Sequence, residues 1–368
     1  MCTAPTINPR GISWWRSAII LIFCCTSAWA DEAEVKVPEL QVLSRVHFNT
    51  NVSDFKQARA FYGRLGFETV SGFPDTNTLE MARAIGVETP TAYDGSQGDS
   101  AGGYLLHGEL IGLGFVGGVI DLIEFSIPRN EAPPYAALNH LGMARAAMLT
   151  TDIDSDYAYM TDIGVRFLSP PVVRKNGSRF AIFKDLDGVF YELLEVEGDV
   201  EETETTHIER LGAVTINVSN YERSAAWYEM FGYELTQRLD AVESLEVAQA
   251  MGLDEAYEIV GGLFTHKRDG SQLEIVEWIS PRDDTPPYAI PINHLGIHRM
   301  AFSTSDLESD VAILEQHGVS FVSPITPCCS GPDSWGGIVA FYDPDGTIIE
   351  LVGQPLMTFM TWIMSWFD

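Results

Sequence analysis

Two arginines stand at the centre of a phrase that the chain contains twice. The phrase reads "NHLGMARAAMLTTD" at residues 139–152 and "NHLGIHRMAFSTSD" at residues 293–306, with Arg145 and Arg299 at matching positions. A guanidinium keeps its charge at physiological pH and cannot ligate a metal, but its fork of N–H donors fits a carboxylate. We therefore expect each arginine either to pair with buried carboxylates or to bind an anionic group of a ligand.

Histidines and tyrosines near this phrase are also duplicated. His140 and His294 belong to the phrase itself, and we expect them first to pack at a joint between structural units and only second to bind a ligand. Tyr135 and Tyr288 each follow a double proline. They are candidates for lining a substrate cavity, although packing is the commoner role of such aromatic residues.

The repeats extend over most of the chain. "FYGRLGFE" (61–68) matches "WYEMFGYE" (227–234), and "KDLDGVFYELLE" (184–195) matches "YDPDGTIIELVG" (342–353), in the same order and at nearly constant spacing. Such self-similarity indicates a duplicated architecture. The sequence therefore predicts one domain at residues 40–198, an acidic linker at 199–206 and a second domain at 207–355.

Each half divides again into two modules. A module opens with a strand-like run, continues with a helical pattern that ends in Gly, and finishes with about three strands. The DxDG segments at 185–188 and 343–346 carry the residues of a tight hairpin turn and lack the other ligands of an EF-hand calcium loop. We expect an α+β fold of four modules, with module one paired to two and three to four; an exchanged pairing of one with four is the alternative.

Charge and the chain termini limit the partners and the location. The chain has 22 basic and 52 acidic residues, which disfavours nucleic acid. Residues 1–30 combine two arginines, a short apolar run and the sequence Ala-Trp-Ala, the layout of a signal peptide for a periplasmic or secreted protein. The apolar tail at 356–368 is too short to span a membrane, so docking onto protein is favoured, and a homodimer is one assembly it allows.

Only two cysteines would remain after such cleavage. Cys328 and Cys329 are adjacent, so they cannot connect distant segments. Thiols in a loop are favoured over a strained vicinal disulfide.

The helix ends and the DxDG turns together resemble the vicinal oxygen chelate superfamily, which includes glyoxalase I, extradiol dioxygenases and bleomycin resistance proteins. The resemblance rests on "HFNTNVSDFKQARAFYGRLGFE", "DLDGVFYELLE" and "DPDGTIIELVG" and covers nearly all of the chain after residue 40. It implies βαβββ modules that pair around a cavity, as two tandem glyoxalase/bleomycin-resistance-like domains. In metal-dependent members the first and last strand of each module supply one ligand each.

Carrying these positions over gives an incomplete metal site in the first half. The resemblance implies His47, Asp121 and Glu192 as ligands for Zn, Mn or Fe, with Arg145 at the fourth position. His47 or Glu192 would serve as ligand or base, and Arg145 would stabilise an anion. The alternative, which we favour slightly, is that Arg145 replaces the metal and pairs with Asp121 and Glu192.

The second half is further from the family pattern. Ala213 replaces one ligand and Arg299 another, which leaves Glu274 and Glu350 as weak metal candidates unless His298 turns inward. Two functions follow from the resemblance. One is a glyoxalase- or dioxygenase-like enzyme acting on a small oxygenated molecule, neutral or anionic; the other is a binding protein that sequesters a small molecule. Arg145, Arg299, Tyr135 and Tyr288 are the predicted substrate-binding residues.

Overall fold

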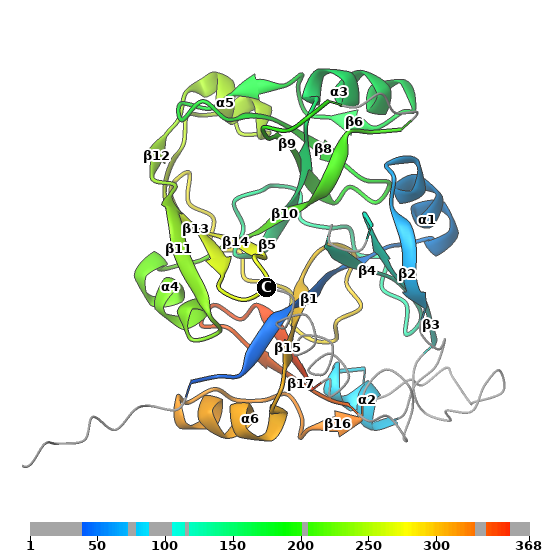
Figure 1. The fold of residues 1–368 in the computed structure, drawn as a ribbon, viewed down its shortest axis with the longest axis vertical. Helices are drawn as coiled ribbons and strands as arrows, with labels where there is room; N and C mark the ends of the chain where they lie inside the picture. Colours follow the sequence, from blue (N-terminus) through cyan, green and yellow to red (C-terminus); the bar gives the residue numbers. More distant parts are fainter. Residues whose placement is uncertain are drawn as a thin grey trace, which may run out of the picture. The chain divides into compact units, whose positions relative to one another are not determined.

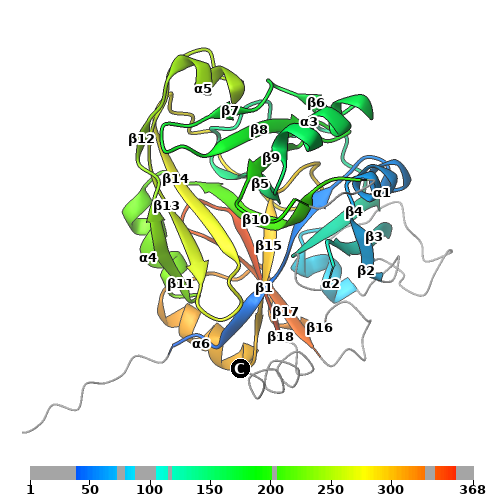
Figure 2. The same cartoon turned by 45° about the horizontal axis from the view of Figure 1, so that its top comes forward.

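Two curled β-sheets, each built from two modules, form the framework of the protein in this computed structural model (Figures 1 and 2). The structure describes residues 39–72, 79–87, 105–114, 118–200, 205–327 and 336–353. The predicted signal peptide, the cysteine pair and the apolar tail lie outside these ranges. The described residues belong to one compact unit. None of the helices in these ranges is long and apolar enough to cross a membrane.

The predicted module order is confirmed in all four copies. Module one contains β1 (Val42–Asn51), α1 (Phe55–Arg64), β2 (Glu68–Gly72), α2 (Leu79–Ala84), β3 (Leu105–Gly112) and β4 (Val119–Ile127). Module two contains β5 (Gly142–Thr150), α3 (Ile153–Asp162), β6 (Arg166–Phe167), β7 (Val172–Val173), β8 (Arg179–Lys184) and β9 (Phe190–Glu195).

The second half repeats this order. Module three contains β10 (Ile208–Asn217), α4 (Tyr221–Glu229), β11 (Tyr233–Arg238), β12 (Ala241–Val242), α5 (Leu245–Ala250), β13 (Glu258–His266) and β14 (Gln272–Ser280). Module four contains β15 (Arg299–Thr304), α6 (Leu307–Gln316), β16 (Thr326–Pro327), β17 (Gly337–Tyr342) and β18 (Ile348–Gly353). The short helices α2 and α5 were not anticipated, because six residues give little periodicity.

The favoured module pairing was wrong. One sheet runs β16-β17-β18-β15-β1-β4-β3-β2 and joins modules one and four; the other runs β11-β13-β14-β10-β5-β9-β8-β6 and joins modules two and three. The connection after module two is anchored beside β5, which places module three against module two. His207, at its end, bonds to Asp156 and Thr151 and so starts β10 antiparallel to β5.

The residue that closes each strand phrase also starts the next helix. Asp54, Asp152, Asn220 and Asp306 each accept a hydrogen bond from the backbone N–H three residues later. This is the N-cap arrangement that satisfies otherwise unpaired helix donors. The repeated Asp or Asn therefore fixes where the strand stops and the helix begins.

The two DxDG segments are turns, as predicted, and they also connect modules. The carboxylate of Asp185 accepts the backbone N–H groups of Asp187 and Val189 and the hydroxyl of Tyr62 in α1. Asp343 repeats this arrangement with Tyr228 in α4. Within each half of the sequence, a helix tyrosine of one module is thus bonded to the turn of the next.

Candidate functional site

The sheet of modules two and three brings three charged side chains together on its concave side, which we call the 2/3 cup. Arg145 on β5 lies opposite Thr215 on β10, which in turn pairs with Glu274 on β14. Glu192 on β9 lies beside Ala147, two residues after Arg145. The register of four strands therefore places one arginine between two carboxylates.

These side chains form a buried ion network that a second arginine completes. Arg145 donates from Nε to Glu192 at 2.6 Å and from Nη2 to Glu274 at 3.0 Å. Arg174 donates to the other oxygen of Glu192 at 2.8 Å, and Thr215 donates to Glu274. Burial alone would raise the pKa of Glu192, but Arg174 and Arg145 outweigh it and lower this pKa to about 2. Glu192 is therefore ionised at any physiological pH.

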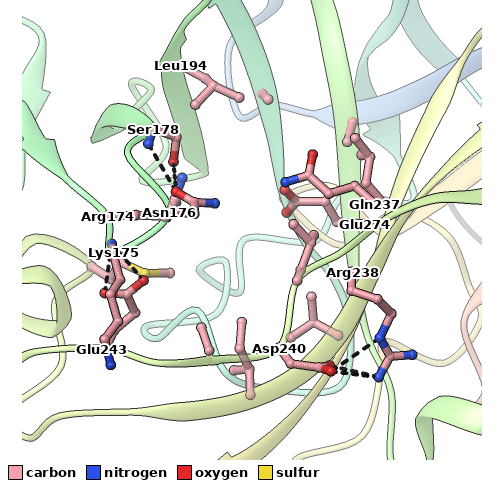
Figure 3. Close-up of a pocket in the computed structure, with 18 of the residues that line it drawn as sticks. Arg174, Lys175, Asn176, Ser178, Leu194, Gln237, Arg238, Asp240, Glu243 and Glu274 are labelled. Carbon is pink, nitrogen blue, oxygen red and sulfur yellow. Dashed lines mark hydrogen bonds and ion pairs between the residues drawn. The ribbon is translucent and has the colours of Figure 1, made fainter.

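A cavity of about 600 Å³ opens above this network (Figure 3). Its lining includes Arg145, Arg174 and Glu274, together with Ala213, at a position where the resemblance implies a metal ligand. Figure 3 shows Glu274 beside Gln237 on one side of the cavity and the turn that carries Arg174 on the other. The small side chain at Ala213 leaves room that a histidine would fill.

The turn between β7 and β8 crosses from module two to module three at the edge of the cavity. Lys175 donates its backbone N–H to the buried carboxylate of Glu243 and its ammonium to the carbonyl of Val242. Arg174 stacks over Phe180 at 3.6 Å from the ring centre. Sequence reasoning missed this turn, although Asn-Gly at 176–177 between two apolar runs is a strong hairpin signal.

The sheet of modules one and four carries the matching positions in what we call the 1/4 cup. His47 on β1 lies opposite Ala301 on β15, which pairs with Glu350 on β18. Two residues after His47, Asn49 pairs with Asp121 on β4. Arg299 donates to Asp121 at 2.7 Å, and its Nε lies 3.4 Å from Glu350. Asp121 and Glu350 thus flank a buried arginine, as Glu274 and Glu192 do in the 2/3 cup.

The 1/4 cup differs from the 2/3 cup in having unpaired buried atoms. His47 Nδ1, Asp121 Oδ1 and Arg299 Nε have no hydrogen-bond partner within the described part of the chain. Burial lowers the pKa of His47 to about 4, with Glu350 opposing this shift. Burial raises the pKa of Asp121 to about 6, with Arg299 opposing it. His47 is therefore neutral at pH 7, so its 3.9 Å approach to Asp121 is not an ion pair.

The exchanged pairing separates residues that the sequence grouped together. Glu192 lies in the 2/3 cup and does not join His47 and Asp121 in the 1/4 cup. Glu274 and Glu350 are likewise in different cups. His298 does not turn toward Glu350: its Nε2 lies 3.0 Å from the side-chain nitrogen of Asn51. The prediction that each arginine pairs with buried carboxylates holds, but each pairs with one carboxylate from either half of the sequence.

The duplicated tyrosines and histidines lie between the connectors that join modules one to two and three to four. Tyr135 stacks on Tyr288 with ring centres 4.1 Å apart, and His140 and His294 stack on the outer faces of this pair at 3.6 and 4.5 Å. None of the four lines the cavity of the 2/3 cup. The four rings pack against one another where the two connectors meet.

Comparison with known proteins places the chain in a family. A profile of the Glyoxalase/Bleomycin resistance protein/Dioxygenase superfamily matches residues 44–193 and again residues 210–351. The chain belongs to this superfamily. Glyoxalase I from Zea mays is similar in structure, with 16% identity over 87% of this chain and 95% of that one and a TM-score of 0.57.

A second superfamily structure, a putative dioxygenase from Bacillus subtilis, has 13% identity, covers 86% of each chain and gives a TM-score of 0.52. No curated protein matches the chain. At these identities the structural likeness shows the glyoxalase-like fold alone.

Neither cup, as arranged, fits the metal that membership of the superfamily implies. In the described ranges no group of three or more His, Cys, Asp or Glu side chains is placed to hold an ion. In the 2/3 cup both carboxylates are already bound by arginines. In the 1/4 cup His47, Asp121 and Glu350 are suitable donor types, but Arg299 lies between the two carboxylates. A fixed positive charge there opposes the binding of a divalent cation.

Proposed function

We propose that the protein binds a small organic molecule in the cavity of the 2/3 cup. The observation that carries this proposal is a cavity of about 600 Å³ set over a buried network in which arginines bind both glutamates. Small-molecule sites are typically concave, of several hundred cubic ångströms, and apolar with a few fixed polar groups. Trp278, Met251 and Leu194 supply apolar lining, and Arg145 supplies a fixed polar group.

The network favours binding over catalysis in this cup. A general base should have a pKa near the working pH, whereas Glu192 has a pKa of about 2 and both of its oxygens are bound by arginine. Glu274 is held by Arg145 and Thr215. The two glutamates therefore hold Arg145 in one orientation, and Arg145 in turn orients a polar group of the ligand.

A cavity-filling variant tests the proposal. Ala213→Leu adds volume inside the cavity, whereas Ala60→Leu adds the same volume on the exposed side of α1. A thermal-shift screen of small organic acids, alcohols and amides should give ligands that stabilise the wild type and Ala60→Leu, but not Ala213→Leu. Equal stabilisation of all three proteins would refute binding in this cavity.

The unpaired atoms of the 1/4 cup support a second candidate function, which is proton transfer. Asp121, with its pKa raised to about 6 and its Oδ1 unpaired, suits a general base, neutral His47 could relay the proton through its unpaired Nδ1, and Arg299 could stabilise an oxyanion next to them. Incubation with α-ketoaldehydes and α-hydroxyketones in D₂O, followed by NMR, should then show C–H exchange or isomerisation that His47→Gln abolishes. Elemental analysis of the wild type beside His47→Ala tests the metal-dependent form of this function; metal bound stoichiometrically through His47 would contradict our assignment of Arg299.

A further inference from the structure

The charge balance of the cavity in the 2/3 cup is opposite to that of the whole chain. The chain carries a formal charge of −30. The lining of the cavity nevertheless contains five basic residues and three acidic ones: Arg145, Arg174, Lys175, Arg210 and Arg238 against Asp240, Glu243 and Glu274. A basic hollow in an acidic molecule attracts and concentrates anions.

The three acidic residues of the lining are already engaged within the protein. Glu274 accepts hydrogen bonds from Arg145 and Thr215. Glu243 accepts the backbone N–H of Lys175, and Asp240 pairs with Arg238. Each of these carboxylates is therefore bonded within the protein, with one oxygen of Glu274 left over.

The basic residues, in contrast, retain unused donors. Arg145 spends Nε and Nη2 on Glu192 and Glu274, and its Nη1 makes no hydrogen bond to any described residue. The exposed side chain of Arg210 on β10 has no acidic partner in the part of the chain that the structure describes. One donor is therefore available at the floor of the cavity, and a whole guanidinium lies on its exposed side.

The remaining lining is apolar. Leu194, Met251, Ile259, Leu263 and Trp278 contribute to it. Burial of an apolar ligand surface against such side chains is favourable at roughly 25 cal/mol for each Å². We infer that the ligand of this cavity is a small monocarboxylate with an apolar, ring-sized body, whose carboxylate is bound by Arg210 on the exposed side of the cavity. This inference rests on the proposed function of the cavity and adds the chemical class of its ligand.

Three probes of the same shape and different charge test this inference. They are 1-naphthoate, the neutral 1-naphthalenemethanol and the cationic 1-naphthylmethylammonium, each titrated into the full-length protein by calorimetry. The wild type should bind naphthoate about tenfold more tightly than the alcohol and the ammonium compound least of all, with a preference that shrinks as salt is added. Arg210→Gln should weaken naphthoate about tenfold and leave the alcohol within about twofold.

Two further variants distinguish an error in the ligand class from an error in the location of the binding site. Arg268→Gln removes the same charge from an exposed turn away from the cavity and should leave all three affinities unchanged. Binding of the alcohol that Ala213→Leu blocks, without preference for naphthoate or without an effect of Arg210→Gln, overturns the inference and leaves the proposed function standing. Binding of none of the probes, or binding that Ala213→Leu leaves intact, overturns both.

Discussion

A buried arginine stands at the same position in both cups, between two carboxylates. Arg299 and Arg145 are placed by matching registers, and each is bonded to a carboxylate on either side or lies within 3.4 Å of it. Two differences between the cups stand out: His47 in the 1/4 cup matches Ala213 in the 2/3 cup, and Arg174 adds a second cation to the 2/3 cup. In both cups the positive guanidinium compensates the negative charge of two carboxylates, which would be costly to bury without it.

We expect Arg299→His to create a divalent metal site in the 1/4 cup. The change removes the fixed positive charge and leaves two imidazoles and two carboxylates together, a donor set suited to Zn²⁺ or Ni²⁺. Calorimetric titration with each ion should show one site per chain, absent from the wild type. Arg145→His is the matched control and should stay metal-free, because Ala213 supplies no ligand and Arg174 still holds Glu192. Metal binding by both variants, or by neither, would contradict this assignment.

Glu192 should be the most costly side chain to neutralise in the 2/3 cup. Glu192→Gln leaves two buried arginines short of a negative charge and should lower the free energy of unfolding by about 3–5 kcal/mol. Glu274→Gln leaves Arg145 paired with Glu192 and should cost only about 1–2 kcal/mol. Urea denaturation of the two variants beside the wild type measures the difference, and equal losses would show that Arg174 does not depend on Glu192.

At the scale of elements, the joints between modules are made by tyrosines that reach the DxDG turns. The strands, four helices and turns follow from periodicity, N-caps and turn residues, which act within a few neighbouring residues and can be read in sequence. The carboxylate grouping could not be predicted, because it depends on which modules meet across the sheet, whereas the turn that carries Arg174 had a readable signal in Asn176-Gly177. The sequence pattern of module one is equally compatible with two or four as its partner.

The Asp185 joint should make stability depend on pH. Burial raises the pKa of Asp185 to about 7, above its unfolded value of 3.8, although the N–H groups of Val189 and Asp187 oppose the shift. Its stabilising contribution is therefore fully present below about pH 4 and is lost as the pH rises through 7. The free energy of unfolding of the wild type should fall by an amount on the order of 2–4 kcal/mol between pH 4 and 8, and Asp185→Asn should not show this fall. Asp199→Asn, at an exposed site, should retain the wild-type pH profile in urea denaturation.

At the scale of the whole molecule, neither half of the sequence contains a complete cup. Residues 39–200 supply β1 and β5, whose partners β15 and β10 both come from the other half. We expect this fragment alone to pair with a second copy of itself, or to remain unfolded, and to assemble with residues 205–353 when the two are produced together. Light scattering measures the outcome, and a stable folded monomer of residues 39–200 would contradict the prediction.

We also propose that the protein is exported, on the strength of the signal-like residues 1–30. Cleavage after Ala30 would give a chain that begins at Asp31. Intact-mass measurement of the protein from the extracytoplasmic fraction should find this terminus, and recovery of the uncleaved chain from the cytoplasm would refute export.

The crossed arrangement of modules has a consequence for how the two copies could diverge. Every cup draws one module from each half of the gene, so replacement of a whole half alters both cups, whereas a substitution within one module alters only one. Specialisation of a single cup, such as the loss of an imidazole at Ala213 while His47 stays, requires substitutions chosen module by module. Recombining one half with that of a relative would therefore yield two hybrid cups and preserve neither parental one.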